Sequence, residues 1–173
     1  MQFGSAVDDL AAHPDGRRIA VDAVTSTFLV DVERMQVTRR WPTGSYGTQL
    51  AFSPSGALLL RQGYRGTYVW DVATQQQKSL ILTGSSAPRA VFTNDEREVV
   101  APTPDEQPSM AFWDIDNGAR GSVMPNAGPV ARIGETMVMA RRGGDRLAFV
   151  TMPFGRELWN LPAPAVFGDH DRM

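Results

Sequence analysis

The chain has 173 residues, of which 42% are hydrophobic and 21% are charged, a composition typical of a folded globular protein long enough to bury a core. The formal net charge of −2 excludes the clear basic excess expected of a protein dedicated to nucleic acid or to a membrane surface. Cysteine is absent, which excludes disulfides, thiolate metal sites and a cysteine nucleophile.

We expect no segment that directs the chain to or through a membrane. No apolar run approaches the roughly 18 residues of a membrane span. Residues 1–16 contain neither the basic nor the apolar region of a signal peptide. We therefore expect a cytoplasmic protein. Lys78 is the only lysine among 17 basic residues, and this arginine-rich usage indicates a GC-rich bacterial genome.

Three segments of the chain follow the same plan. Each begins with small and apolar residues, makes a tight turn, continues in an apolar run, turns again, and ends in a second apolar run closed by an aspartate. In chain order the turns are residues 13–16 (HPDG), 53–56 (SPSG) and 93–96 (TNDE), the first runs are 19–21, 58–60 and 99–101, and the aspartates are Asp31, Asp71 and Asp114.

The spacing of these aspartates is 40 and then 43 residues, and a weaker fourth copy over residues 137–164 places Trp159-Asn160 46 residues further on. The apolar residues form short contiguous runs bounded by Gly, Pro, Asn and Asp, which is typical of strands and not of helices. A strand-rich period of 40 to 45 residues is that of a propeller blade. The contiguous run "ALLL" further predicts strands buried on both faces.

The turns support this interpretation. Pro14 and Pro54 suit the second position of a tight turn because proline fixes φ, while Gly16 and Gly56 provide a permissive closing residue. The runs between the turns are four to six residues long, the usual length of a strand.

The motifs "FSPSG" and "YVWDV", "FTNDE" and "AFWDI", and more loosely "AHPDG" and "FLVDV", resemble those of the WD40 family of β-propellers over about residues 6–162. The resemblance implies blades of four antiparallel strands; in the second blade these are "LAF" (inner), "LLLRQ", "TYVWDV" and "KSLIL" (outer). The family's Gly-His dipeptide is missing from every repeat. So is the aspartate before the Trp-Asp strand, so the family's His–Asp–Ser–Trp hydrogen-bond network cannot form.

We therefore predict an all-β fold, a β-propeller of about four WD40-like blades that is either a partial ring or half of an eight-bladed ring. The blades are expected at about residues 6–47, 48–87, 88–128 and 129–162, within a unit spanning 1–162, followed by a polar tail at 163–173. Pro162 and Pro164 interrupt any outer strand after Trp159. An open arc exposes two apolar faces and a sheet edge. A missing remainder of a longer propeller, a second copy, or closure as a four-bladed ring would each relieve that exposure.

The sequence offers little catalytic chemistry. His13 is expected in a surface turn, and His170 in the tail, where "DHD" is a weak metal motif. No P-loop, G-x-G-x-x-G or G-x-S-x-G motif occurs. Asp8-Asp9 are expected to be solvated acids, with a channel-lining role as the alternative. "RRGGDR", at residues 141–146, is expected to be a turn, and Trp41 to pack against the next blade. We expect no catalytic residue, metal or cofactor.

The family resemblance places partner binding on the disc face that carries the loops between second and third strands and between outer and next inner strands. Tyrosine and arginine are enriched at interface hot spots. The predicted function is a non-catalytic protein-interaction scaffold or sensor that binds a protein partner or a second copy of itself, and neither nucleic acid nor membrane. The alternative is an enzyme-associated propeller that binds or gates a small ligand in the central channel. The candidate partner-binding residues are Tyr46, Tyr64, Arg65, Asp105, Glu106 and Phe154.

Overall fold

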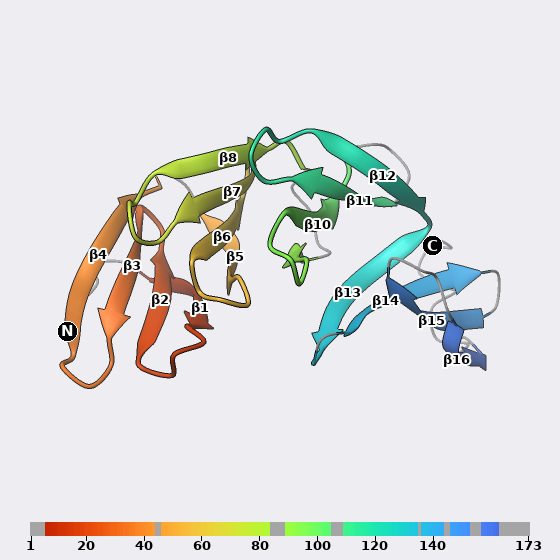
Figure 1. The fold of residues 1–173 in the computed structure, drawn as a ribbon, viewed down its shortest axis with the longest axis horizontal. Coiled ribbons are helices and arrows are strands. Elements are labelled where there is room, and N and C mark those ends of the chain that lie inside the picture. The colour runs from red at the N-terminus through yellow and green to blue at the C-terminus, as the bar shows by residue number, and fades with distance from the viewer. Residues whose placement is uncertain are drawn as a thin grey trace, which may run out of the picture.

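The structure is a computed structural model, and it describes residues 6–43, 46–83, 89–104, 109–134, 136–143, 146–152 and 157–162. In these residues the chain forms sixteen strands and no helix. The strands make four antiparallel sheets of four strands each, and the sheets follow one another along an open arc (Figure 1). The predicted all-β fold of about four four-stranded blades is confirmed.

The first and fourth sheets lie at the two ends of the arc, and each sheet keeps the chain order of its strands. The first sheet contains β1 (Val7–Ala12), β2 (Arg18–Ala23), β3 (Ser26–Asp31) and β4 (Gln36–Pro42). The second contains β5 (Gly47–Phe52), β6 (Leu58–Gly63), β7 (Gly66–Asp71) and β8 (Gln77–Ile81). The third contains β9 (Val91–Phe92), β10 (Glu98–Pro102), β11 (Ser109–Asp114) and β12 (Arg120–Pro125). The fourth contains β13 (Ala127–Ile133), β14 (Thr136–Gly143), β15 (Arg146–Met152) and β16 (Glu157–Pro162).

The turns between first and second strands repeat in conformation as well as in sequence. Gly16 and Gly56 have φ values of 70° and 78°, and their N–H groups donate to the carbonyls three residues earlier. Glu96 occupies the same place in the third sheet with a φ of 57°. The left-handed conformation is therefore kept even where the glycine is lost, because the turn geometry requires it.

The recurring aspartate shapes the turn that follows the third strand. The Asp71 carboxylate accepts the N–H of Thr74 at 2.7 Å, and this bond lowers the pKa of Asp71 below its ordinary value. Asp31 and Asp114 accept the corresponding turn N–H groups from Arg34 and Asn117 at 2.9 and 3.0 Å. The repeated aspartate is thus a structural residue that satisfies backbone donors.

Apolar cores lie between successive sheets. Trp41 of the first sheet is buried and stacks on Trp70 of the second at 6.2 Å between ring centroids, so its predicted packing against the next blade is confirmed. Every residue of β6 is buried, as the "ALLL" run predicts. The core between the first and second sheets contains Ala20, Leu29, Trp41, Leu50, Phe52, Leu59, Trp70 and Val72. The next contains Leu58, Leu60, Val69, Ile81, Phe92, Val99 and Trp113, and the last contains Val100, Met110, Val130, Met137, Met139 and Met152.

The fourth sheet differs from the repeat alignment. The alignment places Trp159 on a third strand, whereas the structure places it on β16, the fourth strand, paired with Phe149. The reason is that Ala127–Ile133, assigned to no strand by the alignment, forms β13 and pairs with β14. The fourth sheet is therefore completed by a strand that precedes the repeat, and it needs none after Pro162.

Candidate functional site

Three of the six candidate partner-binding residues lie at one end of the second sheet. Gly47 pairs with Gly63, so the adjacent residues Tyr46 and Tyr64 extend beyond the same end of β5 and β6. Both tyrosines are exposed, Tyr64 at 80% of its surface, and Arg65 beside it in the β6–β7 turn is exposed as well. Asp105, Glu106 and Phe154 lie outside the described residues. The described candidates thus form one small aromatic and cationic edge.

Polar side chains on the inner strands connect the first sheet to the second and the second sheet to the third. The Asp9 carboxylate accepts the Leu50 N–H at 2.7 Å. Gln49, at the position equivalent to Asp9, accepts the Ala90 N–H and donates to the Ala90 carbonyl, both at 2.7 Å. We call these contacts the inner-strand links. They show that Asp9 is a half-buried structural acid and not the solvated acid expected from sequence.

A buried ion pair joins the first and second sheets. The Nε of Arg61 lies 2.9 and 3.0 Å from the two carboxylate oxygens of Asp22, and both side chains are fully buried. Thr27 donates its hydroxyl to Asp22 at 2.7 Å. A Cβ at Gly47 would overlap the Asp22 carboxylate, so the pair requires glycine there. The sequence analysis missed this pair, although a charge inside each buried run, "IAVDA" and "LLLRQ", was the signal for it.

His13 is buried, and its predicted place on a surface turn is wrong. The His13 ring contacts Phe52 edge-on at 4.8 Å, and its Nε2 lies 3.1 Å from the Gly56 carbonyl oxygen. The turn of the first sheet therefore packs on the turn of the second. Ser55 continues the series by donating its hydroxyl to Glu96 of the third sheet at 2.8 Å.

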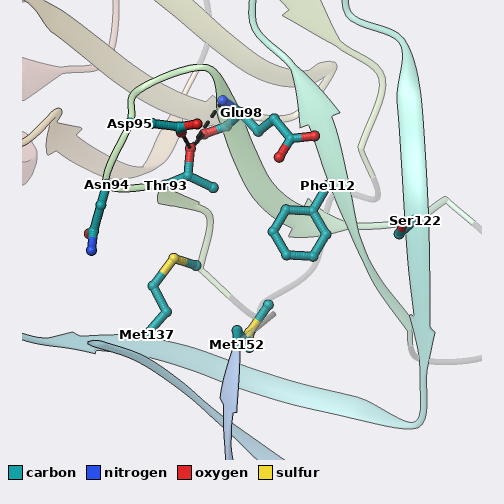
Figure 2. A pocket seen from close by; sticks show the side chains of 8 residues that line it. All are labelled: Thr93, Asn94, Asp95, Glu98, Phe112, Ser122, Met137 and Met152. Atoms are coloured by element: carbon teal, nitrogen blue, oxygen red, sulfur yellow. Dashed lines mark hydrogen bonds between the residues drawn. The ribbon is translucent and has the colours of Figure 1, made fainter. Parts of the chain in front are cut away.

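A cavity of about 390 Å³ lies between the third and fourth sheets. Figure 2 shows the turn that carries Asp95 on one side, two methionines on the other, and Phe112 facing the space between them. The full lining is Thr93, Asn94, Asp95, Glu98, Phe112, Ser122, Met137 and Met152.

The carboxylates of this cavity differ in their environments. Thr93 donates its hydroxyl to Asp95 at 2.7 Å, and this bond holds the pKa of Asp95 below its ordinary value. Burial raises the pKa of Glu98, and the charges of Asp95 and Asp114 raise it further. Within the described part of the chain, no hydrogen bond or ion pair reaches the Glu98 carboxylate. The cavity therefore combines an apolar floor with one carboxylate, that of Glu98, which receives no compensating contact from the described residues.

A second cavity of about 420 Å³ lies where the turns between first and second strands converge, and its described lining holds one charged residue, Arg132. No group of three or more potential metal ligands occurs among the residues that the structure describes, and His170 lies outside them. The described segments also contain no helix capable of spanning a membrane.

This architecture is that of a β-propeller, and comparison with solved structures agrees. The β-propeller domain of Myceliophteria thermophila Cps50 (Swd1) superposes with a TM-score of 0.71 at 14% sequence identity, over 93% of this chain and 58% of that one. Kuenenia stuttgartiensis hydrazine synthase superposes with a TM-score of 0.65 at 16% identity, over 94% of this chain and 52% of that one. The chain thus spans little more than half the length of either structure. No family model and no curated protein matches the sequence.

Proposed function

We propose that the chain is a non-catalytic protein-interaction scaffold, and that its working form is a ring of eight sheets made from two copies. The observation that carries the proposal is the exposure of the first sheet at positions buried elsewhere. Leu10 is 58% exposed, whereas the equivalent Leu50 and Ala90 are 4% and 0% exposed. Val32 is 41% exposed, whereas Val72 and Ile115, its equivalents, are 4% and 2% exposed.

The same comparison indicates what covers this face. In the second and third sheets these positions pack against a preceding four-stranded sheet. The bulge between Val7 and Asp9 matches that between Gly47 and Gln49, so Leu10 is placed as Leu50 is. An exposed apolar face with the geometry of a blade interface fits another blade.

The other end of the arc supplies such a blade. Strand pairing places Ile133, Ala140 and Phe149 on the face of the fourth sheet opposite the core that it shares with the third. Ile133 is largely exposed there. Two copies arranged head to tail bring each first-sheet face against the partner's fourth-sheet face, and this arrangement closes with two-fold symmetry. The aligned region is 58% and 52% of the two solved chains, so both contain structure beyond the part that this chain matches, as an arc completed by further sheets would.

The test is the molar mass in solution, measured by light scattering after size exclusion over a concentration series. We expect a species near twice the 18.9 kDa chain mass and a monomer for Leu10→Glu. Leu82→Glu is the matched control, because Leu82 is 64% exposed but follows β8 in the second sheet, away from both end faces. A monomeric wild type, or a Leu10→Glu variant that still dimerises, would overturn the ring.

The scaffold role is tested separately, at the edge formed by Tyr46, Tyr64 and Arg65. These exposed side chains have the composition of interface anchors. Quantitative affinity capture with the double variant Tyr64→Ala/Arg65→Ala is expected to lose a protein partner that the wild type retains. The double variant Gln76→Ala/Gln77→Ala, at the opposite end of the same sheet, is the control. Equal capture by both variants would contradict this role for the edge.

The channel-ligand alternative stays a prediction. It requires converging carboxylates or arginines at the channel mouth, and Arg132 is the one charged side chain in the described lining of the cavity formed by the converging turns. A single charged side chain in that lining supports the scaffold proposal better than the channel-ligand alternative.

A further inference from the structure

The cavity between the third and fourth sheets breaks the apolar pattern of the repeat. Thr93 accepts and donates hydrogen bonds with the Glu98 backbone just as Ser53 contacts Leu58, so Glu98 and Leu58 hold equivalent positions. Leu58 is buried in the core between the second and third sheets. Glu98 therefore places a carboxyl group at a position that contributes an apolar side chain to an inter-sheet core elsewhere in the arc.

The surroundings of Glu98 do not neutralise this charge. The nearest charged groups that affect it are the carboxylates of Asp95 and Asp114, and both repel its ionised form. Asp95 is itself held ionised by the hydroxyl of Thr93. A half-buried carboxylate with only like charges near it is a site that a cation stabilises.

The rest of the lining limits the kind of cation. Phe112, Met137 and Met152 border the same hollow as Glu98, as Figure 2 shows. A small hydrated metal ion would gain nothing from this apolar floor, and the described residues offer no cluster of metal ligands. A long side chain with an apolar stem and a charged head uses both parts of the lining.

We propose that this cavity binds an arginine side chain of a partner protein. The guanidinium group lies over the Phe112 ring and donates to the Glu98 carboxylate, while the methylene stem packs against Met137 and Met152. Arginine fits better than lysine because its planar group both stacks on aromatic rings and pairs with a carboxylate through two parallel hydrogen bonds. The cavity volume of about 390 Å³ lies within the range of sites for small ligands. The inference rests on the proposed role in protein interaction but not on ring formation.

The probe is a blocked Gly-Arg-Gly tripeptide, and the readout is the NMR signal of methionine methyl groups in the full chain. We expect saturable shifts at Met137 and Met152, and none with the tripeptide in which citrulline, of the same shape but without charge, replaces arginine. Shifts confined to exposed Met35, which is remote from the cavity in the β3–β4 turn, would overturn the proposal.

Two variants test the assigned roles. Glu98→Gln keeps the size of the side chain and is expected to weaken peptide binding at least tenfold, whereas Glu33→Gln, an exposed carboxylate in the β3–β4 turn, is expected to leave it unchanged. If Glu98→Gln does not fold, Phe112→Leu serves instead and is expected to weaken binding through loss of the ring. Unaltered binding by a folded variant of either residue would overturn the site. The light-scattering mass of the same samples reports on the ring independently.

Discussion

Replacing Arg61 with methionine removes one member of the buried ion pair while keeping most of the side-chain volume. Arg61 and Asp22 are both fully buried, and the two Nε–oxygen distances are 2.9 and 3.0 Å. The variant leaves the Asp22 carboxylate inside the protein, where the Thr27 hydroxyl still donates to it at 2.7 Å. A buried charge without its partner is strongly destabilising because the protein interior does not replace the lost hydration.

The expected cost is about 3–5 kcal/mol of the free energy of unfolding, the usual penalty for removing one partner of a buried pair. Domains have total stabilities of about 5–15 kcal/mol, so this is a large fraction. At this chain length each kcal/mol lowers Tm by about 2–4 °C, which gives a decrease of about 6–20 °C. The double variant Asp22→Leu/Arg61→Met removes both charges and is expected to recover most of the loss.

The assay is urea denaturation followed by circular dichroism, at one fixed protein concentration because self-association would add to the apparent stability. The two single variants and the double variant give the coupling free energy between the residues. A loss below about 1 kcal/mol for Arg61→Met would refute the reasoning, because it would mean that water reaches the Asp22 carboxylate and that the pair behaves like an exposed one.

Three further predictions address the contacts between sheets. Gln49→Ala leaves the buried N–H and carbonyl of Ala90 without their partner and is expected to cost about 2–4 kcal/mol in urea denaturation. Gln76→Ala, at an exposed position between β7 and β8, should cost little, and equal losses for the two variants would contradict the role of the link. Gly47→Ala forces a methyl group into the buried ion pair and is expected to cost about 1–3 kcal/mol. Gly121→Ala should be tolerated, because the added Cβ would lie 3.4 Å from its nearest neighbour, the Phe112 carbonyl oxygen. Equal thermal stability of the two variants would argue against the steric requirement. The pKa of Glu98 is raised, so its protonated form adds stability that is present below pH 4.5 and is lost as pH rises through the higher folded-state pKa. The stability of Glu98→Gln is therefore expected to match that of the wild type at low pH and to exceed it at neutral pH. A constant difference in stability across a pH series of melting curves would contradict the pKa assignment.

Short sequence motifs correctly predicted the turns and the strand ends, because the backbone conformation of a few consecutive residues determines them. The turns at Gly16 and Gly56 and the aspartates that close the third strands follow from backbone conformations that few residues adopt. The repeat then assigned the strands of the first three sheets. It misplaced Trp159 because the first strand of the fourth sheet, Ala127–Ile133, has no counterpart motif and is defined by pairing with β14.

Three further features that sequence reasoning missed lie where different sheets meet. Asp22 and Arg61 are 39 residues apart, and the first–second sheet contact brings them together. His13 has the sequence context of an exposed turn, but the neighbouring turn at Gly56 covers it. Glu98 stands out only after the repeat is superposed and its equivalent Leu58 is found in a core. Sequence motifs describe one repeat at a time, and these sites arise between repeats.

The inner-strand links also give the chain a direction in which it can lengthen. In each link the side chain belongs to the earlier sheet and the backbone group to the later one, as with Asp9 and Leu50 and again with Gln49 and Ala90. A duplicated repeat inserted between two sheets therefore brings both halves of the contact: it accepts the side chain from the sheet before it and extends its own to the sheet after it. Because each repeat contacts its neighbours alone, such an insertion leaves the other interfaces intact. Gene duplication can thus change the number of sheets without requiring a new type of contact between sheets.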